Sequence, residues 1–232
     1  MLVNNVDIKI FKARLMSRNI NNAEVEIFNH WGTNNLNPIF YKKGINKFKV
    51  LNITLDIVCN NSNELEIMKS NLIKQLENAT IKFEDIEYYY RGFISGEPSY
   101  KYISASNETL DISLLVIAEK TQITEVMNRI TTKTINVPGN IETPAIVEIT
   151  PSIDIIDIVL TGLSDDPMTV RNLKAAQKVI IDGENGTVTQ NGVNKFTDTD
   201  MWDFPRLKSG SNTITVNRSN VDISIKYKSR WI

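Results

Sequence analysis

The stretch Val221-Asp222-Ile223-Ser224-Ile225-Lys226-Tyr227 decides the fold of this chain, because its residues alternate strictly between apolar and polar. A β-strand points successive side chains to opposite faces, so this stretch predicts a strand with one buried and one solvated face. The segment from Phe48 to Val58 also alternates, with leucine or isoleucine at every second position from Leu51. Together the two stretches predict a mainly β fold.

The second half of the chain carries the same signal in shorter form. Five further strands are predicted there: Ala145 to Thr150, Ile153 to Leu160, Gln177 to Ile181, Thr187 to Gln190 and Asn212 to Asn217. Residue pairs that tolerate positive φ mark corners between strands: Asp182-Gly183, Asn185-Gly186 and Asn191-Gly192. Short strands at this spacing are typical of a β-sandwich.

The first half combines strands with one helix. Its remaining predicted strands are Ile81 to Phe83, Tyr88 to Ile94 and Leu110 to Val116. Between the strands the apolar spacing changes to three or four residues: Leu65, Met68, Leu72, Leu76 and Ala79. Asn61, Ser62 and Asn63 are candidate N-caps, and Glu64 or Glu66 stands three residues after one of them. We therefore expect an amphipathic helix that packs across a sheet.

The segment between the two halves has a weaker pattern. From Glu119 to Thr134 the chain is polar, with a few apolar residues spaced for one short helix or an irregular crossover. Pro138, Gly139 and Pro144 then form a cluster of the kind that ends regular structure and separates domains. We therefore predict two domains, residues 1–136 and residues 137–232.

The charge pattern argues against nucleic-acid and membrane partners. The 26 Lys and Arg residues are scattered among 27 Asp and Glu residues, for a net charge of -1 and a pI of about 6.0. The sequence lacks the basic block that would attract nucleic acid or an anionic membrane. It also lacks a secretory signal pattern and an apolar run of the roughly 18 residues that span a bilayer. We expect a soluble protein made in the cytoplasm.

Residues for catalysis or cofactor binding are nearly absent from the sequence. Cys59 and His30 are the only cysteine and histidine, and Cys59 follows an apolar strand, as expected of a small buried side chain. There is no glycine-rich phosphate loop, no nucleophile elbow and no cluster of His or Cys at metal-ligand spacing. We therefore predict no enzymatic activity, no catalytic or metal-binding residues and no cofactor.

Two groups of side chains each allow a second interpretation. Four acidic residues lie in predicted turns: Asp165, Asp166, Asp182 and Glu184. They are either solvated or the oxygen ligands of a calcium ion, although they do not match the loop of an EF-hand. Five tyrosines lie close together in the sequence: Tyr88, Tyr89, Tyr90, Tyr100 and Tyr102. They are either ordinary strand residues or a platform for a sugar or a protein partner.

The order of the parts resembles a known family. The segments that carry the resemblance in the first half are Val3 to Ile8, the β-helix-β layout through Phe83-Glu84-Asp85, and Tyr90-Arg91-Gly92-Phe93-Ile94-Ser95-Gly96. They resemble the N-terminal domain of the distal tail proteins of long-tailed phages and phage-tail-like particles. The segment from Met201 to Ile214, with a Pro-x-Leu-x-x-Gly-x-Asn pattern from Pro205 to Asn212, is similar to the end of those proteins.

The resemblance implies a structural protein of the virion tail tip or baseplate, encoded by a phage or prophage. Its N-terminal belt domain would be a split β-barrel-like fold with one packed helix, related to tail-tube proteins, and would form a homohexameric ring. Its C-terminal domain would be a galectin-like β-sandwich that docks baseplate or receptor-binding proteins. The tail-tube protein and a tail-associated lysin or baseplate hub protein would be further partners. The resemblance assigns no interface residues and no sugar-binding residues.

A second hypothesis belongs to a different functional class. The C-terminal sandwich could be a carbohydrate-binding module that recognises a cell-surface glycan through an aromatic ring, with Trp202 and Tyr227 as the candidates. A glycosidase would instead need two carboxylates placed together in space, and the sequence selects no such pair.

Overall fold

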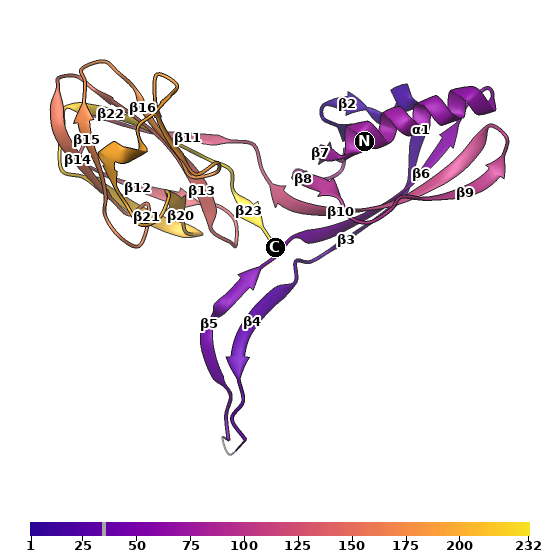
Figure 1. Ribbon diagram of the computed structural model, residues 1–232, viewed down its shortest axis with the longest axis horizontal. Coiled ribbons are helices and arrows are strands. Elements are labelled where there is room, and N and C mark those ends of the chain that lie inside the picture. The colour runs from indigo at the N-terminus through magenta and orange to yellow at the C-terminus, as the bar shows by residue number, and fades with distance from the viewer. Residues whose placement is uncertain (34–35) are drawn as a thin grey trace. The chain divides into compact units, whose positions relative to one another are not determined.

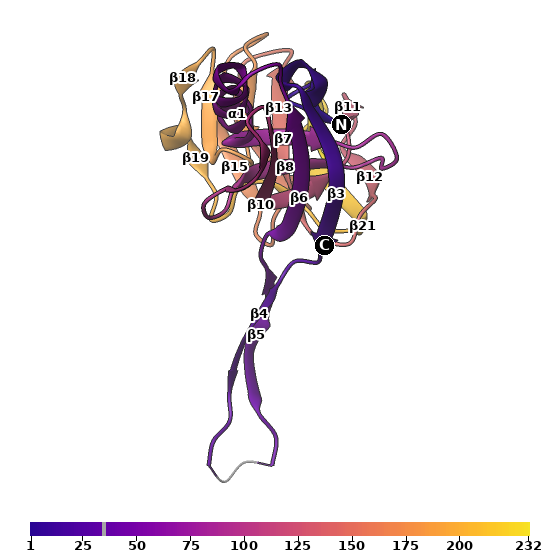
Figure 2. The ribbon, with the colours of Figure 1, turned by 90° about the vertical axis from the view of Figure 1, so that its right-hand side faces the viewer.

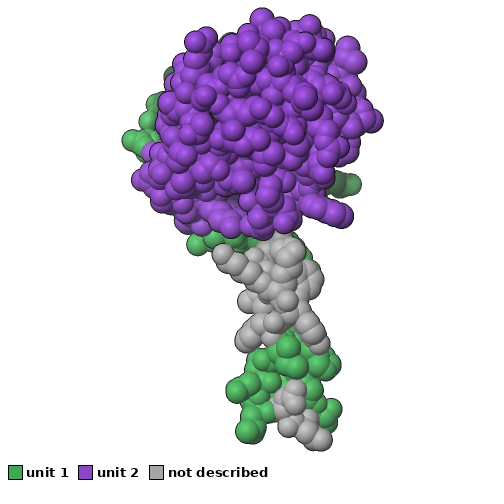
Figure 3. Space-filling model, turned by 90° about the vertical axis from the view of Figure 1, so that its left-hand side faces the viewer, with its two compact units in different colours: residues 1–119, 232 green, residues 120–231 purple. Residues whose placement is uncertain are grey.

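The computed structural model describes residues 1–33 and 36–232 (Figure 1). The chain divides into two compact units, which Figure 3 shows in different colours. Unit 1 comprises Met1–Glu119 and Ile232, and unit 2 comprises Lys120–Trp231. Strands dominate both units, so the predicted mainly β fold class is confirmed.

Unit 1 contains one main antiparallel sheet. Its strands are β1 (Leu2–Val3), β2 (Val6–Asp7), β3 (Ala13–Asn21), β6 (Lys49–Val58), β7 (Asn78–Lys82), β8 (Tyr89–Ile94), β9 (Ser99–Ser104) and β10 (Asn107–Glu119). They pair in the order β2-β1-β7-β8-β10-β6-β3, and β9 pairs with the first part of β10. Alternate residues of β6 are buried, as predicted from the sequence.

The predicted amphipathic helix is confirmed as α1 (Ser62–Leu76). The helix begins after Asn61, whose Oδ1 accepts a hydrogen bond of 2.9 Å from the backbone N–H of Glu64. The Glu64 carboxylate accepts a bond of 2.8 Å from the N–H of Asn60, so the two side chains satisfy donors at the start of the helix. The leucines of the apolar stripe are fully buried in the core of unit 1: Leu65, Leu72 and Leu76. In the described part of the chain, no helix is long and apolar enough to cross a membrane.

A hairpin and a short 3-10 turn complete unit 1. The hairpin consists of β4 (Val25–His30) and β5 (Ile39–Asn46), which form a two-stranded sheet of their own. The chain enters the hairpin from β3 and leaves it into β6, so two neighbouring strands of the main sheet carry its base (Figures 1 and 2). The 3-10 turn η1 (Ile8–Phe11) joins β2 to β3 and buries Ile8 and Phe11.

Unit 2 contains two larger sheets. The first has the order β11-β22-β13-β16-β17-β18, with β11 (Ile123–Asn128), β22 (Val221–Tyr227), β13 (Thr143–Pro151), β16 (Val179–Asp182), β17 (Thr187–Gln190) and β18 (Val193–Asn194). The second has the order β12-β21-β14-β15-β19, with β12 (Thr132–Val137), β21 (Gly210–Val216), β14 (Ile155–Thr161), β15 (Met168–Leu173) and β19 (Thr199–Asp200). Three short elements complete the unit: η2 (Phe196–Asp198), β20 (Arg206–Leu207) and β23 (Arg230–Trp231).

One apolar core lies between the two sheets of unit 2. Val147 and Ile225 of the first sheet and Leu160 and Ile214 of the second belong to the same buried cluster. One face of each sheet is therefore buried and the other faces solvent, which is the arrangement of a β-sandwich. The strand expected from the alternation of residues 221–227 is reproduced residue for residue as β22.

The segment between the halves differs from its prediction. Instead of a short helix or an irregular crossover, Glu119 to Thr134 contains the end of β10, all of β11 and the start of β12. The apolar spacing suits a helix, but β11 pairs with β22 and places Met127 opposite Ile223 in the core. Because β11 and β12 both pair within unit 2, the two units divide after Glu119 rather than after residue 136.

Two of the predicted corners need glycine for different reasons. Between β17 and β18, Asn191 has φ 51° and Gly192 has φ 78°, the two positive values of a type I′ hairpin turn. Gly183 has no positive φ; a Cβ there would lie 2.2 Å from the carbonyl oxygen of Pro205 and 2.7 Å from that of Ala145. At this position glycine lets three backbone segments approach closely.

Candidate assembly surfaces

The β4–β5 hairpin exposes apolar side chains that its own chain does not bury. Val25, Trp31, Leu36 and Ile39 are 47%, 64%, 95% and 49% exposed. The sequence of residues 28–41 contains no Asp, Glu, Lys or Arg. In the described part of the chain, β4 and β5 pair only with each other. Two strands alone are marginally stable in water, so this hairpin is a candidate surface for a partner.

Strand β9 forms an open edge of the main sheet. All six of its residues are exposed, and within the described residues it pairs with β10 alone. Tyr100, Tyr102 and Ile103 are the large side chains that it presents to solvent. An edge strand carries unpaired N–H and C=O groups that can pair with a strand of another chain. The β9 edge is therefore a second candidate for assembly.

Strand β3 is the edge strand of the main sheet beside β6, and a β-bulge interrupts its middle. A β-bulge at Met16 shifts its register against β6. Arg14 and Arg18 lie on either side of the bulge, and Arg14 pairs with Asp56 of β6 at 3.2 Å. Bulges and charged side chains restrict uncontrolled edge pairing, so these features limit which strands can pair with β3.

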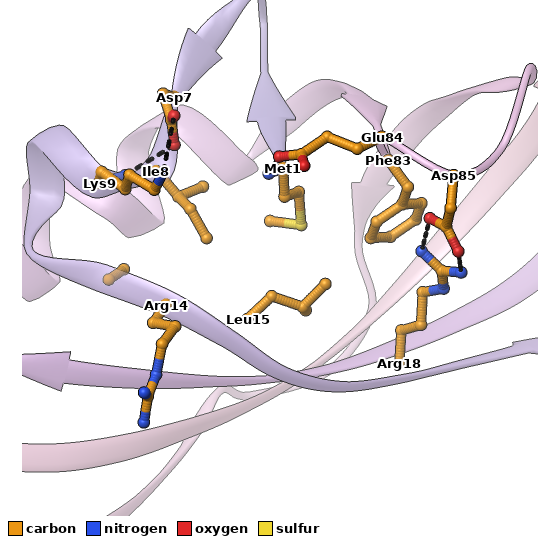
Figure 4. Close-up of a pocket in the computed structure, with 11 residues that line it drawn as sticks. Met1, Asp7, Ile8, Lys9, Arg14, Leu15, Arg18, Phe83, Glu84 and Asp85 are labelled. Carbon is orange, nitrogen blue, oxygen red and sulfur yellow. Dashed lines mark hydrogen bonds and ion pairs between the residues drawn. The ribbon is translucent and has the colours of Figure 1, made fainter.

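A cavity of about 370 Å³ opens beside β3 (Figure 4). Met1, Ile8, Leu15 and Phe83 give it an apolar lining, and charged side chains of η1, β3 and the segment after β7 surround it. Apolar pockets beside a sheet edge receive side chains of an added strand. The cavity could therefore accept one apolar side chain of a partner that pairs along β3.

Arg18 fixes one wall of this cavity. It donates two hydrogen bonds to the Asp85 carboxylate, one of them 2.6 Å long, and its Cζ lies 4.5 Å from the centroid of the Phe83 ring. These hydrogen bonds lower the pKa of Asp85 to about 2. The carboxylate is therefore ionised at neutral pH, where it holds Arg18 in place and has no proton to donate.

The only cysteine and the only histidine have separate surroundings. Cys59 follows β6 and is buried, and burial raises the pKa of its thiol. A thiol with a raised pKa is a weak nucleophile at neutral pH. His30 is the last residue of β4 and is exposed on the hairpin.

The acidic turn residues of unit 2 take part in ion pairs and turn hydrogen bonds. Asp165 pairs with Arg206 at 2.7 Å, and the exposed Asp166 follows it. Asp182 accepts a hydrogen bond of 2.8 Å from the backbone N–H of Glu184, which stabilises the turn between β16 and β17. Among residues 1–33 and 36–232, no group of three or more acidic, histidine or cysteine side chains is placed to hold a metal ion.

The aromatic candidates divide between core and surface. Tyr90 is buried in the core of unit 1, whereas Tyr100 and Tyr102 lie on the exposed strand β9. In unit 2, Tyr227 is only 3% exposed and cannot offer its ring to a sugar. Trp202 is 87% exposed, so it is the one of the two glycan candidates that a ligand can reach.

A comparison with protein families identifies the type of domain that unit 2 contains. Residues 138–231 match the model of the "Siphovirus-type tail component, C-terminal domain" (SPP1_Dit). Unit 2 therefore carries a siphovirus-type tail component domain. The match confirms the resemblance to phage distal tail proteins that the segment from Met201 to Ile214 indicates. No curated protein sequence matches the chain.

Solved structures of similar fold match the whole chain and not only the tail component domain. The crystal structure of the SPP1 Dit (gp 19.1) protein is described as a paradigm of the hub adsorption apparatus in phages that infect Gram-positive bacteria. It has a TM-score of 0.76 and 8% identity, over 100% of this chain and 98% of that chain. A chain of the phage P2 baseplate in its activated conformation with Ca has a TM-score of 0.58 and 12% identity, over 97% and 94%. Both are similar to this chain in fold.

Proposed function

We propose that this chain is a structural, non-enzymatic subunit of the phage tail tip that assembles through unit 1 into a ring-shaped hub of six copies. The hub joins the tail tube to the baseplate or the host-recognition apparatus. The observation that carries the proposal is the β4–β5 hairpin, where Val25, Trp31, Leu36 and Ile39 are exposed and the two strands pair only with each other in the described chain.

The hairpin supports the proposal of assembly because it has only two strands. A two-stranded hairpin needs a further strand or a packed surface to be stable in water. Its exposed Trp31 and Leu36 would gain about 1.5–3 kcal/mol each by full burial against a neighbouring copy. The hairpin therefore acts as an arm that packs on the next subunit.

The β9 edge and the β3 edge of the main sheet support closure into a ring. When the β9 edge of one copy meets the β3 edge of the next, the contact joins two different surfaces. Such a contact repeats from copy to copy until the ring closes. The bulge at Met16 and the cavity beside β3 select which strand fits this edge.

The face of β6 and β10 that points away from the core suits a ring with a central channel. It carries Asn52, Thr54, Asp111 and Ser113, and the Thr54 hydroxyl donates a 2.6 Å hydrogen bond to the Asp111 carboxylate. Proteins hold DNA mainly through Lys and Arg contacts to phosphate. The face also carries the apolar pair Val50 and Leu115, and the neighbouring Arg14 of β3 is paired with Asp56 of β6. A face without unpaired Lys or Arg among these side chains lets DNA pass without holding it.

The remaining partners belong to the tail tip. Unit 1 continues the tail tube, and unit 2 offers its outer surfaces to a tail-associated lysin, a baseplate hub protein or a receptor-binding protein. The site of action is the tip of the virion tail.

Size-exclusion chromatography with light scattering tests the proposal, first on the chain alone and then with the tail-tube protein added. We expect a discrete oligomer, and negative-stain images should show rings. A strict monomer under both conditions contradicts the proposal.

A further inference from the structure

An exposed tyrosine of β9 lies on the same face of the main sheet as the core of unit 1. The strand register places Tyr100 opposite the buried Leu110 of β10, and Tyr102 opposite Glu108. The Lys69 ammonium of α1 lies 4.5 Å from the centroid of the Tyr100 ring, so both tyrosines stand on the helix side of the sheet. Tyr102 is 69% exposed. It is therefore an aromatic side chain that its own chain leaves largely uncovered.

The cavity beside β3 opens on this same face. Leu15 of β3 lies opposite the buried Leu55 of β6, and Arg18 lies opposite Ile53. Leu15 and Arg18 both line the cavity, whose volume is about 370 Å³ (Figure 4). An apolar cavity of about 150 Å³ can hold a benzene ring. The cavity therefore has room for the ring of a tyrosine from another chain.

The direction of the strands and the symmetry of a ring bring β9 of one copy to the cavity of the next. Strands β9, β10, β6 and β3 are successively antiparallel, so β9 and β3 run in opposite directions. Rotation about a ring axis carries one sheet into the next without turning it over. A neighbouring β9 would therefore pair antiparallel with β3 and keep its tyrosines on the side of the cavity.

The charges on the other face of the sheet select the register of this pairing. The strand registers place Lys101 of β9 in one row with Arg14 of β3, so an unshifted joint would set two cations side by side. A shift of two residues towards η1 would set Lys101 level with Lys12, which is opposite Val58. The same shift in the other direction sets Lys101 level with Ser17. Closed sheets require such a stagger, and an even shift keeps each side chain on its face.

We propose that the Tyr102 side chain of one copy fills the cavity beside β3 of the next copy, level with Leu15. This inference rests on the proposed ring and adds the contact that sets its register. Pockets beside a sheet edge receive alternate side chains of an added strand. A buried tyrosine hydroxyl needs a hydrogen-bond partner, and the Asp85 carboxylate at the cavity wall is an acceptor.

Photo-crosslinking of the assembled full chain tests this proposal. Tyr102→p-benzoylphenylalanine places a photoreactive aromatic group at the position of the tyrosine, and mass spectrometry of the covalent dimers locates the cross-links. We expect them at residues 7–18 and 83–85 of the neighbouring copy, which line the cavity. Lys101→p-benzoylphenylalanine is the matched control, because residue 101 faces the other side of the sheet. Its cross-links should lie outside the cavity.

Assembly measured by light scattering gives an independent readout. Tyr102→Ala should raise the protein concentration at which half of the chains are assembled by about tenfold or more, and Lys101→Ala should leave it within about twofold. Leu15→Trp fills the cavity from its own side and should weaken assembly as Tyr102→Ala does. Urea unfolding of each variant shows that the comparison is made between folded proteins.

The outcomes separate this contact from the ring itself. If rings form and the cross-links from residue 102 run to the hairpin or to unit 2, the Tyr102 contact is overturned and the ring stands. The contact is also overturned if Lys101→Ala weakens assembly as much as Tyr102→Ala does. If the unchanged chain stays monomeric, both alone and with the tail-tube protein added, the ring and the contact fail together.

Discussion

Removal of the β4–β5 hairpin should abolish ring assembly and leave unit 1 folded. The base of the hairpin allows a clean excision, because the Lys47 N–H donates a 2.9 Å hydrogen bond to the Glu24 carbonyl oxygen. A β-turn closes with the same bond, so residues 25–46 can be replaced by Asn-Gly between these two residues. The pairing of β3 with β6, which ends at Asn21 and Val50, stays intact.

The expected change in stability follows from the same geometry. Shortening the connection from 22 residues to two lowers the entropic cost of closing it by at most about 2 kcal/mol. The free energy of unfolding should therefore stay the same or rise by up to that amount. Urea unfolding measures it, and light scattering should report a monomer.

Leu36→Ser tests the same arm without shortening the chain. Its side chain is 95% exposed, so the monomer should keep its stability while assembly requires a higher protein concentration. Rings formed by the excised variant at the wild-type concentration would refute the reasoning. So would a loss of more than about 2 kcal/mol of stability, because the hairpin would then be part of the core of unit 1.

Three further predictions concern the two units separately. Leu72→Ala should destabilise unit 1 by about 2–5 kcal/mol in urea unfolding, whereas Ile67→Ala on the exposed side of α1 should change it by less than about 0.5 kcal/mol; equal effects would show that α1 does not pack as described. Gly183→Ala should destabilise unit 2 by about 1–3 kcal/mol through the clash at 2.2 Å, and an unchanged melting temperature would contradict the close approach. Asp85 has a pKa of about 2 in the folded chain and a higher pKa in the unfolded chain. Its pairing with Arg18 therefore stabilises unit 1 above about pH 4, and this stabilisation is lost as the pH falls through 2. Asp85→Asn should flatten this part of the pH–stability profile, and an unchanged profile would contradict the pairing.

The sequence predicts those strands best that bury one face in their own chain. Val221–Tyr227 and Thr187–Gln190 are found at their predicted bounds, because a buried face forces the apolar residues into a period of two. The helix is predicted for the same reason, since Leu65, Leu72 and Leu76 face the core. The segment after Glu119 misleads because its apolar spacing fits a helix, and only pairing with β22 settles it as a strand.

The candidate assembly surfaces could not be predicted from the sequence, and the reason is the opposite one. Ser99–Ser104 is exposed along its whole length, so no buried face imposes a periodic pattern that would mark it as a strand. The strands Val25–His30 and Ile39–Asn46 pair only with each other in the described chain, and no alternating pattern marks them in the sequence either. Neighbours on different strands are equally hidden in the sequence, because Thr134 and Thr213 become neighbours only through the register of β12 and β21. Trp202 is noticeable in the sequence, but its exposure and its place beside β19 come from the structure.

Native mass spectrometry of the full chain tests the central claim most directly. One chain has a mass of 26.3 kDa, so six copies would give about 158 kDa. We predict one dominant species at this mass, which disappears when residues 25–46 are replaced by Asn-Gly. A monomer at every concentration, both alone and with the tail-tube protein added, or a continuous ladder of oligomers that never closes, would contradict the account of a ring-forming tail-tip subunit.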